Sequence, residues 1–242
     1  MVACAHHRLV PLALFLQAIN EIEMELNIYQ KLQLGLNFFE LLACVAGFIY
    51  WKKIKNSYWK WFSIYLLMIV LAELFCQYLL YFLENPNQWI YVNFIIPCEF
   101  LFFFWLFYMY FKNSRQKMLP LIGAGIYLVC FTIDRLYLSK HEFAFFSFSY
   151  VVGSIVLLVL ILVFLLRLVR SDEILHYKTN MMLWVSLGLL LFFLGSLPFY
   201  GLYNTLAANY SNVFNTYWIV QMCFDYCMYL FFAFAFIWGR PK

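Results

Sequence analysis

VVGSIVLLVLILVFLLRLVR, residues 151–170, decides the class of this protein, because it is almost wholly apolar until Arg167 and Arg170 end it. A membrane-spanning helix needs about 20 consecutive, predominantly apolar residues. The run has no alternation of polar and apolar residues, so it predicts a helix rather than a strand of a membrane barrel. A helix also satisfies its own backbone hydrogen bonds, as the hydrocarbon core of a bilayer requires.

The composition extends this conclusion to the whole chain. Of its 242 residues, 66% are hydrophobic, 23% are aromatic and only 12% are charged. A soluble domain of this length could not cover so much apolar surface with polar residues. We therefore expect the lipid bilayer to be its main partner. The net charge of +4 does not indicate nucleic-acid binding, because the basic residues lie in loops between apolar runs.

Seven such runs can be distinguished, and they predict an all-α, polytopic membrane bundle with seven transmembrane helices in a domain that covers residues 34–239. Seven of the eight tryptophans fall at predicted helix ends, where an amphipathic ring is favoured at the membrane surface: Trp51, Trp59, Trp61, Trp89, Trp184, Trp218 and Trp238. The predicted helices are 34–51, 60–83, 89–111, 118–138, 146–169, 181–202 and 214–238.

Positive charge appears in every second loop, and this predicts the orientation. Of the 16 basic residues, Arg8, Lys31, Arg135 and Lys140 belong to one side of the membrane. The other twelve share the opposite side: Lys52, Lys53, Lys55, Lys60, Lys112, Arg115, Lys117, Arg167, Arg170, Lys178, Arg240 and Lys242. Because cytoplasmic loops are enriched in Lys and Arg, we expect the N-terminus outside and the C-terminus in the cytoplasm.

Residues 1–33 are expected to form an extracytoplasmic or peripheral segment. The apolar stretch 9–19 is too short to span a membrane and contains Pro11. No small-x-small cleavage site follows it, which argues against a signal peptide. Met24 is an alternative first residue, and in that case residues 1–23 would be an artefact of a wrongly assigned start.

Five acidic residues lie inside the predicted helices, and three of them, Glu73, Glu99 and Asp225, fall near the middle of the bilayer. Glu40 and Asp134 fall in its outer third. On insertion scales an acidic residue at the helix centre costs about 2.5–3.5 kcal/mol. No Lys or Arg is predicted at the central depth, so these carboxyl groups need a proton, hydrogen-bond donors, water or an external cation.

Amide side chains accompany the central acids. Gln77 lies one helical turn from Glu73, Gln221 lies one turn from Asp225, and Asn93 opens the irregular stretch that leads to Glu99. Two interpretations remain open. The six residues either line a polar site for a ligand, a proton or an ion, or they join helices by hydrogen bonds worth about 0.6–2 kcal/mol each. The candidate ligand- or proton-binding residues are Glu73, Glu99, Asp225, Asn93, Gln77 and Gln221.

Proline and glycine mark where the helices are expected to bend or touch. Pro97 and Pro198 each remove a backbone hydrogen bond, so both are candidate hinges, and broken helices at membrane depth often line cavities. Small residues allow close helix contact, which we expect at three pairs, Ala43 with Gly47, Gly123 with Gly125 and Gly188 with Gly195.

Several enzyme classes are disfavoured by missing residues. The last predicted helix has no lysine for a retinal Schiff base like that of microbial rhodopsins. The four histidines lie in tails or loops, which argues against haem ligation and an intramembrane zinc hydrolase. We therefore expect no catalytic residue, metal site or cofactor, although paired carboxylates leave a lipid-acting enzyme as a third-ranked hypothesis.

Three stretches resemble a family of uncharacterised bacterial proteins with seven predicted helices. They are Asn93–Phe103, then Phe146–Tyr150 with Gly153–Ser154, and Gly195–Tyr200. The resemblance covers nearly the whole chain after residue 30. It implies a location in the inner (cytoplasmic) membrane and transfers no activity.

Two functional hypotheses rank above that of a lipid-acting enzyme. The first is a sensory or regulatory membrane component that binds a small ligand or a proton and signals to a partner through its basic cytoplasmic loops. The alternative is a proton- or cation-coupled transporter of small solutes, in which Glu73, Glu99 and Asp225 act and Pro97 and Pro198 bend.

Overall fold

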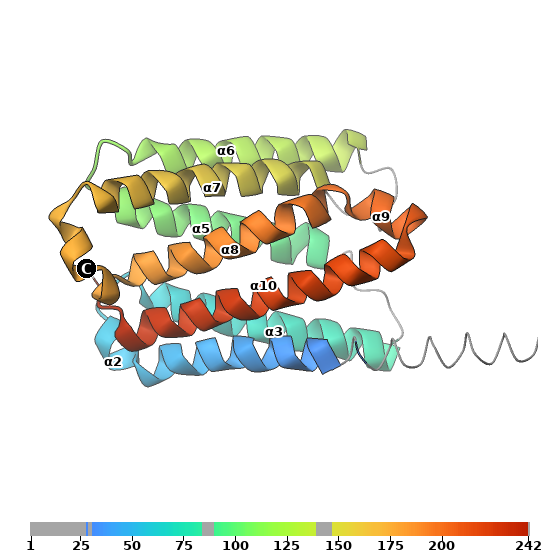
Figure 1. The fold of residues 1–242 in the computed structure, drawn as a ribbon, viewed down its shortest axis with the longest axis horizontal. Coiled ribbons are helices and arrows are strands. Elements are labelled where there is room, and N and C mark those ends of the chain that lie inside the picture. The colour runs from blue at the N-terminus through green and yellow to red at the C-terminus, as the bar shows by residue number, and fades with distance from the viewer. Residues whose placement is uncertain (1–27, 29–30, 84–89, 139–146, 242) are drawn as a thin grey trace, which may run out of the picture.

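In a computed structural model the chain is a bundle of long helices that run along a common axis (Figure 1). The structure describes residues 28, 31–83, 90–138 and 147–241. The segment 1–27, with Met24, lies outside this part, as do Lys140 and Trp89. Six of the described helices are long and apolar enough to cross a membrane, so the chain is a multi-pass helical membrane protein. They are Lys31–Ile49, Tyr91–Phe111, Met118–Tyr137, Phe148–Val169, Met181–Gly201 and Ser211–Trp238.

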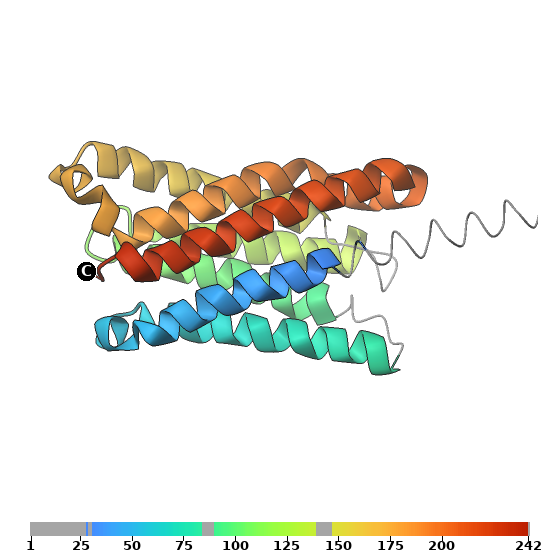
Figure 2. The same cartoon turned by 60° about the horizontal axis from the view of Figure 1, so that its bottom comes forward.

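The remaining elements join or accompany these helices. α3 has 24 residues and lies beside the first helix, Lys31–Ile49, in both ribbon views (Figures 1 and 2). The boundaries agree with those predicted from the sequence to within a few residues, because apolar length alone sets them. In chain order the elements are α2 (Trp51–Ile54), α3 (Lys60–Leu83), η1 (Tyr91–Ile95), α5 (Ile96–Phe111), α6 (Met118–Ile133), η2 (Asp134–Leu138), α7 (Ser147–Val169), η3 (Asp172–Thr179), α8 (Met181–Gly201), α9 (Tyr203–Asn209) and α10 (Ser211–Trp238).

Helix packing is closest between α8 and α10, while α7 packs against both α6 and α8. Gly188 permits the close approach: a Cβ atom there would lie 3.1 Å from the Met228 carbonyl oxygen and 2.9 Å from the Cβ atom of Phe231. The prediction of close contact is confirmed for Gly188. It is wrong for Gly125, where an added Cβ atom would have no neighbour from another helix within 4 Å. Gly125 is exposed on α6.

Two of the tryptophans predicted at helix ends differ from that expectation in different ways. Trp59 lies at the expected place, directly before α3, but it is 1% exposed and packs edge-on against Phe62. Trp218 lies two turns inside α10, because this helix begins at Ser211, three residues before the predicted start.

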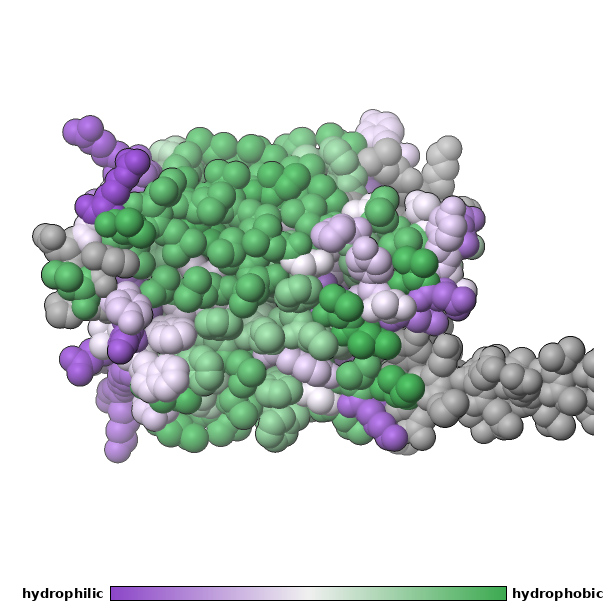
Figure 3. Space-filling model, viewed as in Figure 1, coloured by the Kyte–Doolittle hydropathy of each residue, from purple (hydrophilic) through white to green (hydrophobic). Residues whose placement is uncertain are grey.

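The two ends of the bundle differ in charge. Basic residues gather where α2, the start of α3, the end of α7, η3 and the C-terminus meet, and Figure 3 shows this end as hydrophilic beside a hydrophobic flank. Lys31 and Arg135 lie at the other end. At the basic end Lys53 donates from Nζ to the Phe236 carbonyl oxygen at 3.0 Å, so it caps α10. Burial, together with nearby Arg240, lowers the pKa of Lys53 below its ordinary value.

Of the two irregularities predicted at prolines, only the one at Pro97 is found within the described helices, because α8 continues through Pro198. Before Pro97 the chain forms the π-helix η1, closed by the hydrogen bond from the Ile96 N–H to the Tyr91 carbonyl oxygen. Pro97 itself lies in the first turn of α5, where a missing N–H costs little. α8 runs through Pro198 and ends three residues later, at Gly201.

Candidate ligand-binding site

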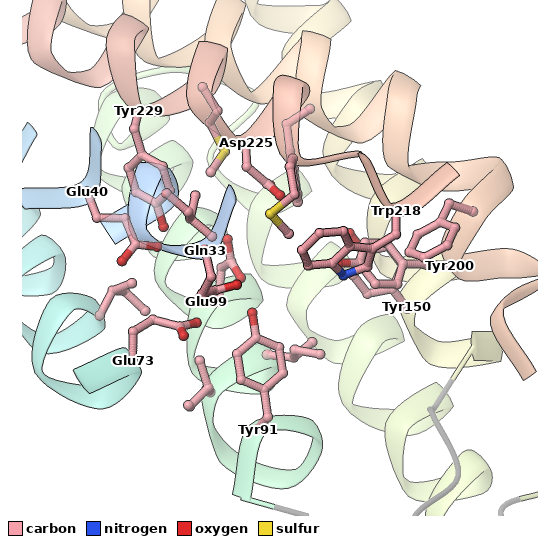
Figure 4. A pocket seen from close by; sticks show the side chains of 18 of the residues that line it. Gln33, Glu40, Glu73, Tyr91, Glu99, Tyr150, Tyr200, Trp218, Asp225 and Tyr229 are labelled. Carbon is pink, nitrogen blue, oxygen red and sulfur yellow. The ribbon is translucent and has the colours of Figure 1, made fainter. Parts of the chain in front are cut away.

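A cavity of about 240 Å³ lies inside the bundle, in the half that is nearer to α9 (Figure 4). Four acidic residues line it, and each comes from a different helix: Glu40 from the first helix, Glu73 from α3, Glu99 from α5 and Asp225 from α10. Figure 4 shows Glu40, Glu73 and Glu99 pointing toward the same space. The four carboxyl groups interact electrostatically with one another.

The structure thus brings together the three acids that the sequence places at the middle of the bilayer. Of the predicted amides, Gln221 is buried and donates from Nε2 to Asp225 Oδ1 at 3.4 Å, behind the cavity wall. Asn93 is partly buried in η1 and is not among the cavity-lining residues. Gln77 lies in α3, but its side chain is outside the part that the structure describes.

Both candidate hinges adjoin the cavity without lining it. Ile96, the residue before Pro97, and Phe199, the residue after Pro198, form part of the wall. Tyr91, at the start of the π-helix, lines the same cavity. The irregular backbone of η1 is therefore next to the acidic site, as is common for π-helical turns at functional sites.

Tyrosine hydroxyls and an amide satisfy part of the acidic cluster. Tyr229 hydrogen-bonds the Glu40 carboxyl group, and Tyr91 hydrogen-bonds that of Glu73. With Gln221 on Asp225, three of the four carboxyl groups have a neutral side-chain partner. Neutral partners leave the charge of an ionised carboxylate uncompensated, so the cluster retains an affinity for cations.

Aromatic side chains form the wall of the cavity beside Asp225. Figure 4 shows Trp218, Tyr200 and Tyr150 grouped on this side. The Tyr150 and Tyr200 ring centroids lie 4.5 Å apart, and Tyr203 stacks on Tyr200 at 6.1 Å. Tyr150 is fixed by the hydrogen bond from its hydroxyl to Ser196 Oγ, at 3.2 Å. The rings thus form a closely packed aromatic wall on this side of the cavity.

The ionisable side chains that line this site in the described part of the chain are carboxyl groups and tyrosines. Among the described residues, no Lys, Arg or His lines the cavity. Four ionised and uncompensated carboxylates at membrane depth would cost on the order of 10 kcal/mol, as much as the whole stability of a typical domain. Protons or a bound cation must therefore offset this cost. Within the described part of the chain, no group of three or more His, Cys, Asp or Glu is arranged to hold a metal ion.

Glu40 belongs to the site, although its predicted depth had separated it from the three central acids. The first helix begins near Lys31 rather than at residue 34. At 1.5 Å per residue, Glu40 therefore lies about 14 Å from that helix end, close to the about 15 Å that separates Glu73 from Leu83. The general rule that intramembrane acids mark functional sites would have found it. No signal distinguished the lining tyrosines among the 19 of the chain.

Asp134 is the acid that stays outside the site. It is buried, and its Oδ2 atom accepts a hydrogen bond from the Ser149 N–H at 2.9 Å. Ser149 lies in the first turn of α7, where backbone N–H groups have no partner within the helix. Asp134 thus caps α7 from the neighbouring helix, which is a structural role.

No protein-family model matches this chain, and no curated protein or solved structure does so either.

Proposed function

We propose that the chain crosses the membrane seven times, with its N-terminal end outside and its C-terminal end in the cytoplasm. α3 supplies the seventh crossing, because 24 helical residues reach about 36 Å, enough for a hydrocarbon core of about 30 Å. The basic end of the bundle supports this orientation. With it, the cavity opens in the outer half of the inner (cytoplasmic) membrane, the location that the resemblance to bacterial seven-helix proteins also implies.

Within this framework the ligand of the cavity is a small organic cation, such as a quaternary or primary ammonium compound. One observation carries this proposal: four carboxyl groups and a wall of aromatic rings face one space that has no basic residue among its described lining. Carboxylates attract the charge of such a ligand, and aromatic faces attract its alkylammonium surface. The volume of about 240 Å³ lies below the range of about 300–1,000 Å³ for drug-sized ligands, so a small one fits.

The role proposed for this binding is sensory or regulatory. A cation held between Glu40, Glu73, Glu99 and Asp225 would favour the packing in which the four helices approach it most closely. α10 continues from Asp225 to Trp238 at the basic end, where Lys53 binds its last turn. A shift of α10 would thus reach the cytoplasmic loops, which a signalling partner can contact.

Cation-coupled transport is the second candidate, and the irregular backbone beside the cavity favours it. η1, whose Tyr91 lines the cavity, adjoins the acidic cluster, and transporters bind substrates next to such irregular helices. In that case bending at Pro97 and Pro198 would expose the acids alternately to the two sides.

A binding experiment tests the ligand class. The purified full-length protein in nanodiscs is titrated with choline and with 3,3-dimethylbutanol, the neutral carbon isostere of choline. We expect choline to raise the thermal unfolding temperature and the isostere to leave it unchanged. Glu99→Gln and Asp225→Asn should abolish the choline effect, while Asp134→Asn, a buried acid outside the cavity, should preserve it. The proposal would be refuted if both compounds raised the unfolding temperature equally, or if neither compound raised it.

A flux experiment separates the two roles. The protein is reconstituted in liposomes that contain a pH-sensitive dye, and a choline gradient is imposed. Choline or proton flux that disappears in Glu99→Gln would establish transport and exclude a purely sensory role. Choline binding without flux would support the sensory role.

A further inference from the structure

We propose that the basic end of the bundle carries a second site, which binds the phosphate headgroup of an anionic phospholipid. This site lies where the loop between α5 and α6 meets the C-terminal end of α7. It consists of two adjoining cavities of about 420 and 380 Å³ that share Gln116 and Arg167. Asn113, Ser114 and Arg115 complete the first cavity, and Val163, Leu166, Arg170 and Ser171 complete the second. The proposal is independent of the acidic cavity, which lies in the other half of the bundle.

Three guanidinium groups, those of Arg115, Arg167 and Arg170, give this site its chemistry. The planar fork of an arginine binds two phosphate oxygens at once, and all three arginines remain exposed to an incoming anion. No acidic residue lines either cavity in the part of the chain that the structure describes. The side chains of Asp172 and Glu173, which follow Ser171, are outside that part. Within the described lining, the positive charge therefore has no acidic counter-ion.

The site is ordered before any ligand binds. Ser114 Oγ donates to the Phe111 carbonyl oxygen at 3.0 Å and accepts from the Gln116 N–H at 3.2 Å, which fixes the loop. The guanidinium of Arg167 lies over the Phe111 ring at 5.9 Å, so the arginine is held beside this loop. A preformed arrangement of this kind reduces the entropy that binding would otherwise cost.

Gln116 lies in the wall that the two cavities share. Its Oε1 atom is buried and has no partner among the described residues. This acceptor needs a donor and a phosphate oxygen only accepts, so the proposal is carried by the arginines and not by Gln116.

The apolar side of the second cavity favours a lipid over a free phosphate ion. Leu166 and Val163 lie one and two turns before Arg170 on α7, and Leu166 is 57% exposed. This places an apolar surface for acyl chains directly under the charged groups. Basic pockets between helices at the cytoplasmic end typically bind anionic lipid headgroups in this way.

The test is lipid retention measured by native mass spectrometry. The full-length protein is released from nanodiscs of phosphatidylcholine that contain added phosphatidylglycerol. We expect retained phosphatidylglycerol, and about five-fold weaker retention for each of Arg115→Gln and Arg167→Gln. The matched control is the double variant Lys52→Gln/Lys55→Gln, which removes two exposed cations from the same membrane end without touching either cavity.

Three outcomes would overturn the proposal. Equal loss in the lysine control would show that general surface charge, not this site, retains the lipid. Displacement by inorganic phosphate or glycerol phosphate at equal concentration would show a site for soluble anions. Unchanged retention in both arginine variants would show that the lipid binds elsewhere. Arg167→Lys guards against misfolding, since it keeps the charge and should retain more lipid than Arg167→Gln.

Discussion

At the scale of single residues, buried acids of this chain fall into two classes that the sequence does not separate. Glu40, Glu73, Glu99 and Asp225 face a cavity, whereas Asp134 accepts a hydrogen bond from the first turn of α7. All five lie in apolar helices, so the rule that intramembrane acids mark functional sites applies equally to each of them. Only the partner atom distinguishes a ligand-binding carboxyl group from a helix cap.

Asp134→Ala should therefore lower the stability of the protein and leave ligand binding intact. The loss of a capping acceptor costs about 0.5–2 kcal/mol, and Asp134→Asn should cost less because the amide oxygen still accepts from the Ser149 N–H. Thermal unfolding in detergent measures the first effect, and choline titration of the folded fraction measures the second. A variant as stable as the parent would contradict the capping role.

A substitution of Trp218 tests the contribution of the aromatic wall to choline binding separately from that of the carboxyl groups. Trp218→Leu removes a ring face that a cation can contact, which is worth about 0.5–2 kcal/mol, or roughly a 2- to 30-fold loss in choline affinity. Trp105→Leu is the control, because this ring lies on the outer surface between α3 and α5, away from the cavity. Equal affinity losses in both variants would indicate a general packing effect instead.

At the scale of the elements, the sequence determines the helices but not their contacts. Apolar length predicts each helix to within a few residues, because the membrane thickness imposes it. Pro97 predicts an irregularity, yet the π-helical form of η1 depends on hydrogen bonds that composition does not encode. The sequence does not identify the lining tyrosines either, because nothing in the pattern of an aromatic helix indicates which rings face a cavity.

The α8–α10 contact gives the sharpest prediction about packing. Gly188→Val introduces a branched side chain where even a Cβ atom would meet the Met228 carbonyl oxygen, so we expect a loss of about 1–3 kcal/mol. Gly125→Val is the matched control, since that position in α6 is open, and it should stay near the parent. A comparison of the thermal unfolding temperatures of the two variants tests this prediction. If Gly125→Val is the less stable one, the helix arrangement proposed for the bundle fails.

At the scale of the whole molecule, the two proposed sites lie in opposite halves of the bundle, and acidic residues line one of them while arginines line the other. The acidic cavity lies in the half nearer to α9, and the arginine cavities lie at the basic end. If the N-terminal end is outside, the first site samples extracytoplasmic cations and the second contacts the cytoplasmic leaflet, which attracts basic residues through its anionic lipids. The opposite orientation would reverse both assignments, so the orientation is the property on which the functional account most depends.

Cysteine labelling in intact cells measures that orientation directly. Asn212→Cys, at the start of α10, should react with a membrane-impermeant maleimide added outside, whereas Asn56→Cys, in the exposed loop before α3, should react only after the cells are opened. Both variants carry Cys4→Ser, and the Cys4→Ser chain alone is the background control, because the other six cysteines lie within the apolar helices. The reverse labelling pattern would place the acidic cavity in the cytoplasmic half. Cytoplasmic amines or protons would then become its natural ligands.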